Sequence, residues 1–67
     1  MDINTMLDGI AEVIVNNSDI GAEPDDEIIF EGLEDVSTND GPNGVESVTI
    51  ICTDGKVIEI TAKVVEG

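Results

Sequence analysis

The residues of this chain that could do chemistry are its carboxylates. Nine of the 22 residues from Asp19 to Asp40 are acidic, and this segment contains no Lys, Arg or His. Like charges repel one another and destabilise a compact state, so a small fold would normally place cations among them. We therefore expect the acidity itself to be the function, as an anionic surface that fits a cationic site.

The residue types that most enzymes use are missing. The chain has no His, Arg or Tyr, and therefore lacks the usual general base, phosphate clamp and phenol donor. Cys52 has no imidazole to activate it. Paired carboxylates could act as a glycosidase acid and base, but 67 residues leave little room for the cleft that this reaction needs. We predict a protein that is not an enzyme and has no cofactor.

Calcium binding is an alternative use of the carboxylates. Four residues match positions 1, 3, 5 and 12 of an EF-hand-like loop: Asp35, Ser37, Asn39 and Glu46. The Gly required at position 6 is Asp40 here, however, and the next segment is predicted to be a strand rather than a helix. A calcium-binding module is therefore the less favoured alternative, and no metal site is predicted.

The charge is distributed unevenly along the chain. Sixteen acids and two lysines give a net charge of −14, and residues 1–44 contain twelve acids and no base. High acidity with few aromatic residues is typical of disordered chains. The Ile and Val residues nevertheless recur in periodic segments, which favours one ordered domain over residues 1–67.

Cysteine usage and hydropathy indicate the compartment. Cys52 is the only cysteine, so no internal disulfide forms, and a lone thiol fits a reducing environment. The sequence has neither a signal-peptide pattern nor an apolar run long enough to span a membrane, which predicts a cytoplasmic protein. With two lysines and no arginine, direct binding to nucleic acid or to an anionic membrane is not expected.

The clearest periodic pattern lies near the beginning of the chain. Apolar residues recur there at the spacing of one helix face: Ile3, Met6, Leu7, Ile10, Val13 and Ile14. This pattern predicts an amphipathic helix over residues 3–17, with Asp2 as its N-cap. Asp8 and Glu12 fall on the solvent face of this helix, one turn apart.

The last third of the chain predicts a β-hairpin over residues 45–65. A two-residue loop would place polar side chains opposite apolar ones, whereas a three-residue loop with Gly55 in the left-handed conformation avoids this. Its central pairs would be apolar: Ile50 with Ile58, and Val48 with Ile60. Cys52 then points into the core. Ile51 and Val57 adjoin on the other face, either as ordinary exposed side chains or as a spot for a partner or for dimerisation.

The segment between the helix and the hairpin is ambiguous. Residues 27–33 alternate as a strand would, although Pro24 and the acids after it could instead open a helix. We predict a strand over 27–33 and a polar loop over 34–44, because adjacent Ile residues, Phe30 and Gly32 favour a strand. The predicted fold class is thus α+β, an N-terminal amphipathic helix packed on a small, three-stranded antiparallel sheet.

A small, strongly acidic, Lys- and Arg-poor chain with this layout resembles the phage-encoded DNA-mimic inhibitors. These include many anti-CRISPR proteins and inhibitors of restriction or repair enzymes. The resemblance covers the whole chain and is one of composition and layout. It implies that the protein acts in the cytoplasm of a host cell and blocks the DNA-binding site of a nucleic-acid-binding complex, such as a CRISPR surveillance complex.

The spacing of the charges is compatible with such a role. DNA carries a negative charge about every 3.4 Å along each strand, and carboxylates one helical turn apart are about 5–6 Å apart. A mimic also needs its charges held in place, so the hypothesis requires that residues 27–33 be fixed by the fold. The predicted contact residues are Asp8, Glu12, Asp19, Glu23, Asp25, Asp26, Glu27, Glu31, Glu34 and Asp35.

The acidity could also serve solubility, adaptation to high salt or a different kind of partner. Solubility alone needs a net charge of magnitude about 2 to 8. Halophilic adaptation usually depletes Ile, whereas this chain has ten. An acidic antidote that neutralises a basic toxin or nuclease is the alternative from another functional class. For the mimic and the antidote alike, the expected partner is a basic protein or complex, and the chain itself is expected to be a monomer or a weak homodimer.

Overall fold

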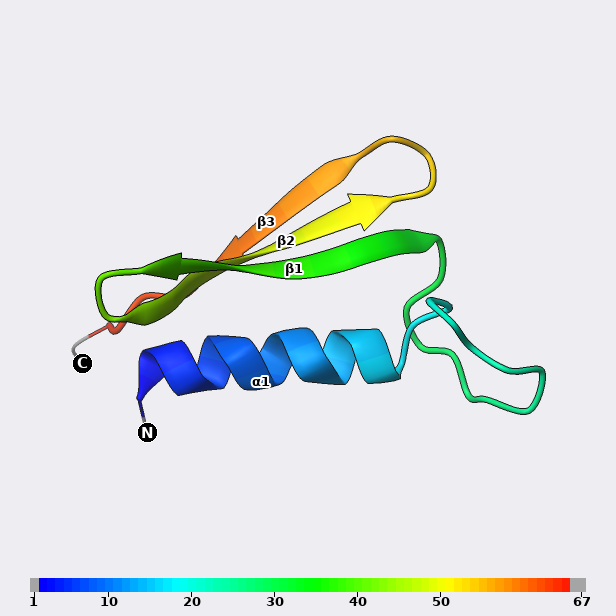
Figure 1. Ribbon diagram of the computed structural model, residues 1–67, viewed down its shortest axis with the longest axis horizontal. Helices are drawn as coiled ribbons and strands as arrows, with labels where there is room; N and C mark the ends of the chain where they lie inside the picture. Colours follow the sequence, from blue (N-terminus) through cyan, green and yellow to red (C-terminus); the bar gives the residue numbers. More distant parts are fainter. Residues whose placement is uncertain (1, 66–67) are drawn as a thin grey trace.

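The structure is a computed structural model that describes residues 2–65. It contains one helix, α1 (Ile3–Asn16), and three strands, β1 (Leu33–Gly41), β2 (Gly44–Cys52) and β3 (Val57–Thr61). The strands form an antiparallel sheet in the order β1-β2-β3, and α1 lies along one side of it (Figure 1). This two-layer arrangement confirms the predicted α+β fold class.

Polar side chains define both ends of α1. The Asp2 carboxylate accepts a hydrogen bond from the Asn4 N–H at 3.1 Å, as predicted for an N-cap. Asn17 is the C-cap, and its backbone N–H and side-chain amide both donate to the carbonyl oxygen of Val13. The predicted helix is therefore confirmed, with its last helical residue at Asn16.

The hairpin register is also confirmed. Ile50 lies opposite Ile58, and Val48 lies opposite Ile60. The loop between β2 and β3 has three residues, and Gly55 adopts a φ of 92°, in the left-handed region that favours glycine. Its N–H donates to the Cys52 carbonyl at 3.0 Å, which closes the turn.

The prediction of a strand over residues 27–33 is wrong. Within that segment Phe30 forms only an isolated bridge with Ser18, and Leu33 begins β1. The predicted polar loop over 34–44 instead supplies most of β1 and the turn into β2. A polar sequence can form β1 because it is an edge strand that buries few side chains. Val36, opposite Ile50, faces the helix, while its neighbours are polar and exposed.

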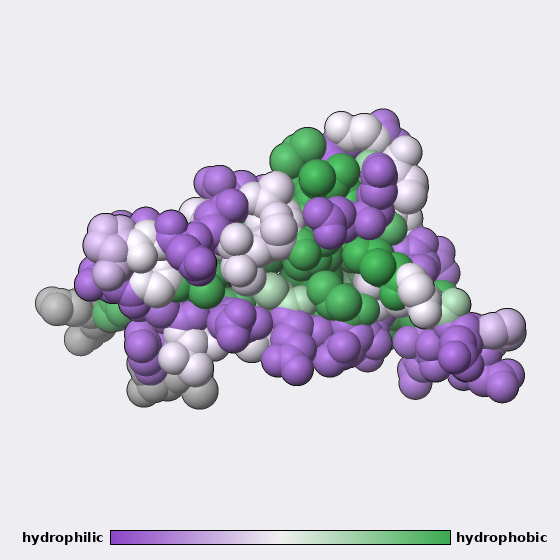
Figure 2. All heavy atoms as spheres, viewed as in Figure 1, coloured by the Kyte–Doolittle hydropathy of each residue, from purple (hydrophilic) through white to green (hydrophobic). Residues whose placement is uncertain are grey.

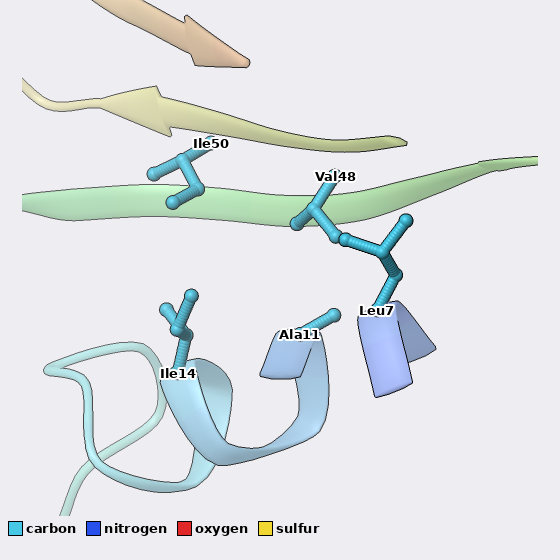
Figure 3. Close-up of a cluster of buried hydrophobic side chains, with 5 residues drawn as sticks. All are labelled: Leu7, Ala11, Ile14, Val48 and Ile50. Carbon is cyan, nitrogen blue, oxygen red and sulfur yellow. The ribbon is translucent and has the colours of Figure 1, made fainter. Parts of the chain in front are cut away.

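The core is small and lies between α1 and the central strand. Five residues are buried there: Leu7, Ala11 and Ile14 of α1, and Val48 and Ile50 of β2. Figure 3 shows the three helix side chains pointing toward the two side chains of β2. Cys52 is partly buried and packs against this cluster, which confirms its predicted orientation. Helix α1 packs against β2 and β1, so the helix-facing side of β3 is only partly covered.

Candidate functional site

Four of the predicted contact residues share one loop between α1 and β1. We call residues 20–28 the acidic loop; its exposed carboxylates are Glu23, Asp25, Asp26 and Glu27. Figure 1 shows this part of the chain projecting beyond the C-terminal end of α1. At the base of the loop, the N–H groups of Ile29 and Phe30 donate to the Asn17 carbonyl at 2.8 and 3.0 Å. These bonds tie the base of the loop to the end of α1 although no regular strand forms.

Asp19 holds the other side of this base. Its two carboxylate oxygens accept the backbone N–H groups of Gly32 and Leu33, at 2.9 and 3.1 Å. These bonds, first from Gly32 and then from Leu33, lower the pKa of the Asp19 carboxyl below its ordinary value, because they stabilise the charged form. Asp19 is therefore a structural anchor for the start of β1, a role that its place in the acidic run did not reveal.

Asp26 also has an internal partner. Its carboxylate accepts the Glu23 N–H at 2.8 Å, which folds the tip of the acidic loop into a turn around Pro24. Asp25 and Glu27 make no side-chain hydrogen bond within the described part of the chain. The tip thus combines one carboxylate that shapes the loop with others that face solvent.

The remaining predicted residues lie on two other elements. Asp8 and Glu12 are exposed one turn apart on α1. Glu31, Glu34 and Asp35 are exposed at the start of β1, where a bulge interrupts the pairing between Leu33 and Asp35. Eight of the ten carboxylates are therefore spread over α1, the acidic loop and β1, while Asp19 and Glu31 lie in the segments that join these elements; together they form a surface rather than a pocket.

An open depression joins α1 to the β1–β2 hairpin at the opposite end of the helix. It has a volume of about 340 Å³ and brings Asp8 together with two carboxylates outside the predicted set, Asp2 and Asp40. The Asn4 side chain crosses its floor and donates to the Val45 carbonyl at 2.6 Å. Asp2 and Asp40 are far apart in sequence, so only the β1–β2 pairing reveals that they belong to the same surface.

The residues of the calcium hypothesis do not form a binding loop. Ser37 and Asn39 lie on extended β1, and the Asn39 amide donates to hydroxyl groups of β2. The Glu46 side chain lies directly over Gly41, where a Cβ atom would collide with it. Asp35, Ser37 and Asn39 lie on one face of this strand, but a rise of about 3.3 Å per residue spaces them along a row instead of gathering them around one ion. Within residues 2–65, no group of three or more potential ligands could hold a metal ion.

Very little of the negative charge is compensated inside the fold. Among the residues that the structure describes, the one ion pair joins Lys56 to Asp54 at 3.5 Å, and both side chains are exposed. None of the predicted contact carboxylates has a cationic partner within that part of the chain. The surface therefore carries a concentrated negative field that is open to an external cation.

The surface differs in polarity between the acidic loop and the sheet. Figure 2 shows hydrophobic side chains over β3 and between the sheet and α1, while the projecting loop is largely hydrophilic. The described chain contains no helix that is both long enough and apolar enough to cross a membrane. In comparisons with protein-family models, curated proteins and solved structures, no match to this chain was found.

Proposed function

We propose that this protein is a non-enzymatic inhibitor whose acidic surface mimics DNA and occupies the DNA-binding site of a basic protein or complex. The observation that carries the proposal is the display of exposed carboxylates without internal counter-ions on three adjoining elements. A DNA-binding groove is lined with Lys and Arg, which such a surface can pair with in place of phosphates.

Local structure supports this use of the carboxylates. Bonds from Asn17 and Asp19 hold the base of the acidic loop, and Asp8 and Glu12 are carried by a helix. Charges that are positioned before binding lose less conformational entropy when they dock than charges on a disordered tail. Although no strand forms over residues 27–33, hydrogen bonds hold residues 29–33 of that segment in place.

Binding of this kind depends strongly on ionic strength. The Debye length falls from about 10 Å at 0.1 M salt to about 3 Å at 1 M, so attraction between exposed charges weakens steeply. At low salt, a net charge of −14 on so small a protein also accelerates encounter with a basic partner. Added salt is expected to slow association and weaken the complex.

The test is displacement of a DNA-binding protein from DNA by two matched variants. Host proteins retained on DNA-cellulose are eluted with the purified protein, and each displaced species is retested in mobility-shift assays. The loop variant is Glu23→Gln/Asp25→Asn/Glu27→Gln, which spares the structural Asp26. The control is Glu46→Gln/Glu59→Gln/Glu66→Gln, three carboxylates outside the predicted contact set. Each removes three carboxylates, so both have a net charge of −11 instead of −14.

The proposal predicts that wild type and the control displace the partner while the loop variant displaces it much less. If both variants lost the ability to displace the partner to the same extent, displacement would depend only on net charge. That result would refute the assignment of the acidic loop as the binding surface. A partner that binds this protein and DNA simultaneously would refute DNA mimicry altogether. That outcome is the one expected of an antidote that blocks a toxin or nuclease away from its DNA-binding surface.

A further inference from the structure

The outer edge of β3 differs from the other edge of the sheet. Strand β1 has polar, charged residues and an extra residue, Glu34, at a register shift, features that discourage pairing with another chain. Strand β3, Val57–Thr61, has neither a bulge nor a proline, and three of its five residues are Val or Ile. Among the described residues, no strand pairs with its outer edge. This edge is short and has one charged residue, Glu59, at its centre, but neither a bulge nor a proline interrupts its backbone hydrogen-bonding groups.

An apolar surface adjoins this open edge. Ile58 is on the helix-facing side of the sheet, opposite Ile50, yet 46% of it is exposed because α1 packs over β2 and β1. On α1, Asn4 and Asp8 line the depression on the β1 side. At about 100° per residue, the partly buried Ile10 falls on the opposite flank of the face that packs on the sheet.

The backbone of β3 presents regular hydrogen-bonding groups at the edge. The Cys52 N–H donates to the Lys56 carbonyl at 2.8 Å. Because hydrogen-bonded pairs alternate along an antiparallel ladder, residues 58 and 60 also bond to β2. The N–H and C=O groups of Val57, Glu59 and Thr61 therefore point outward, away from the sheet.

The charge around β3 also differs from that of the rest of the chain. Residues 53–65 contain two acids, Asp54 and Glu59, and two lysines, Lys56 and Lys63, so their formal charges cancel. The remaining residues carry the full charge of −14. Two copies that meet along β3 thus approach through a region without net charge, which lowers their mutual repulsion.

The molecule also exposes more surface than its size requires. Its accessible surface is 4899 Å², whereas the usual scaling for a 7.0 kDa monomer gives about 4,000 Å². Its radius of gyration of 13.2 Å exceeds the value of about 11 Å for a compact chain of this length. The molecule is elongated, with extents of 41 × 24 × 23 Å, and its projecting loop contributes to this excess together with the open sheet.

We propose that β3 pairs antiparallel with β3 of a second copy of this chain, forming a six-stranded sheet across a twofold axis. The register follows from side-chain chemistry. Centring the axis on Glu59 would place two glutamates directly opposite each other, which is unfavourable. Centring it on Ile60 pairs Ile60 with its own counterpart, Ile58 with Ala62, and Glu59 with Thr61. Glu59 then lies diagonal to Lys63 of the other copy, just beyond β3, and also to the other Glu59, which is farther away than in the first register.

This interface does not rest on the proposed function, and salt distinguishes the two. Raising the salt from about 0.1 M to about 1 M screens the repulsion between two copies of charge −14. Dimerisation through β3 therefore strengthens with salt, whereas binding to a cationic DNA-binding site weakens. A failure of either proposal can be recognised without reference to the other.

Sedimentation equilibrium of the purified chain tests the interface. The expected mass rises from 7.0 kDa toward twice that value with protein concentration, and rises further at high salt. Ile58→Lys is expected to remain monomeric. Ile29→Lys, the same substitution at an exposed loop position with the same net charge, is expected to dimerise like wild type. A wild type that stays at 7.0 kDa in 1 M salt, or equal dimerisation of both variants, would overturn the proposal.

A second measurement needs no variant. Amide hydrogen exchange by NMR should show that the N–H groups of Val57, Glu59 and Thr61 become more protected as concentration rises. The N–H groups of Ile58 and Ile60 bond to β2 and should be protected at every concentration. If exchange of the three outward N–H groups does not depend on concentration, β3 is not the interface.

Discussion

Replacing Leu7 by Ala should remove a large part of the stability of this protein. Leu7 is only 2% exposed and belongs to a core of five buried residues. Truncation of a buried Leu to Ala typically costs about 3–5 kcal/mol. At about 0.05–0.15 kcal/mol per residue, a chain of 67 residues has a free energy of unfolding of about 3–10 kcal/mol. The variant is therefore expected to lose between about a third of its stability and all of it.

Urea denaturation followed by far-UV circular dichroism measures this loss as a lower midpoint with an unchanged slope. Val13→Ala is the matched control, because Val13 lies on the same helix but is 56% exposed. Its free energy of unfolding should change by no more than about 0.5 kcal/mol. A larger loss for Val13→Ala than for Leu7→Ala would mean that α1 packs on the sheet through another face, and the description of the core would be wrong.

Three further substitutions test the local structure. Asp19→Asn should lower the urea midpoint and speed proteolysis in the acidic loop, because an NH₂ donor would replace one of the two carboxylate oxygens that accept the Gly32 and Leu33 N–H groups. Since folding lowers the pKa of Asp19, its contribution is present above the ordinary value of about 3.9 and is lost as the pH falls through the folded pKa. The difference between this variant and wild type should therefore shrink below about pH 4; a difference that grew on acidification would contradict the assigned bonds. Gly9→Ala should raise the free energy of unfolding by about 0.5–1 kcal/mol, because its new Cβ meets nothing within 4 Å on a helix. Gly55→Ala should lower it by about 1–2 kcal/mol, since Gly55 has a positive φ; equal effects of the two glycine replacements would refute the assigned turn.

The helix and the hairpin could be predicted because each has a strong local signal. The apolar stripe of α1 spans almost four turns, and the pairing of Ile50 with Ile58 follows from separating polar and apolar faces. Strand β1 has no comparable signal. Its sequence is mostly polar, and it becomes a strand because Leu33 and Val36 pack against the core while its backbone pairs with β2.

The turn after β1 did contain a usable clue. Pro42 and Asn43 lie between two glycines, and Gly44 has a φ of 117°. Pro followed by Asn is typical of the central positions of a β-turn. A β-turn at this position joins two adjacent strands, one directly before it and one directly after it. The third strand therefore lies directly before Pro42, where β1 is found, and not at residues 27–33.

Exposure of the candidate carboxylates could be predicted, but their individual roles could not. All ten are exposed, as their charge requires. The anchoring role of Asp19 depends on backbone groups thirteen and fourteen residues away, and the grouping of Asp2 with Asp40 depends on strand pairing. Such long-range contacts leave no pattern in the local sequence.

DNA mimicry requires that this protein and DNA exclude each other from one basic site. The most direct measurement is the apparent Kd of the protein for its partner at increasing concentrations of the partner's DNA, at about 0.05 M and about 0.2 M salt. The apparent Kd is expected to rise in proportion to the DNA concentration, and binding is expected to be weaker at the higher salt. An apparent Kd that does not change with DNA would contradict DNA mimicry.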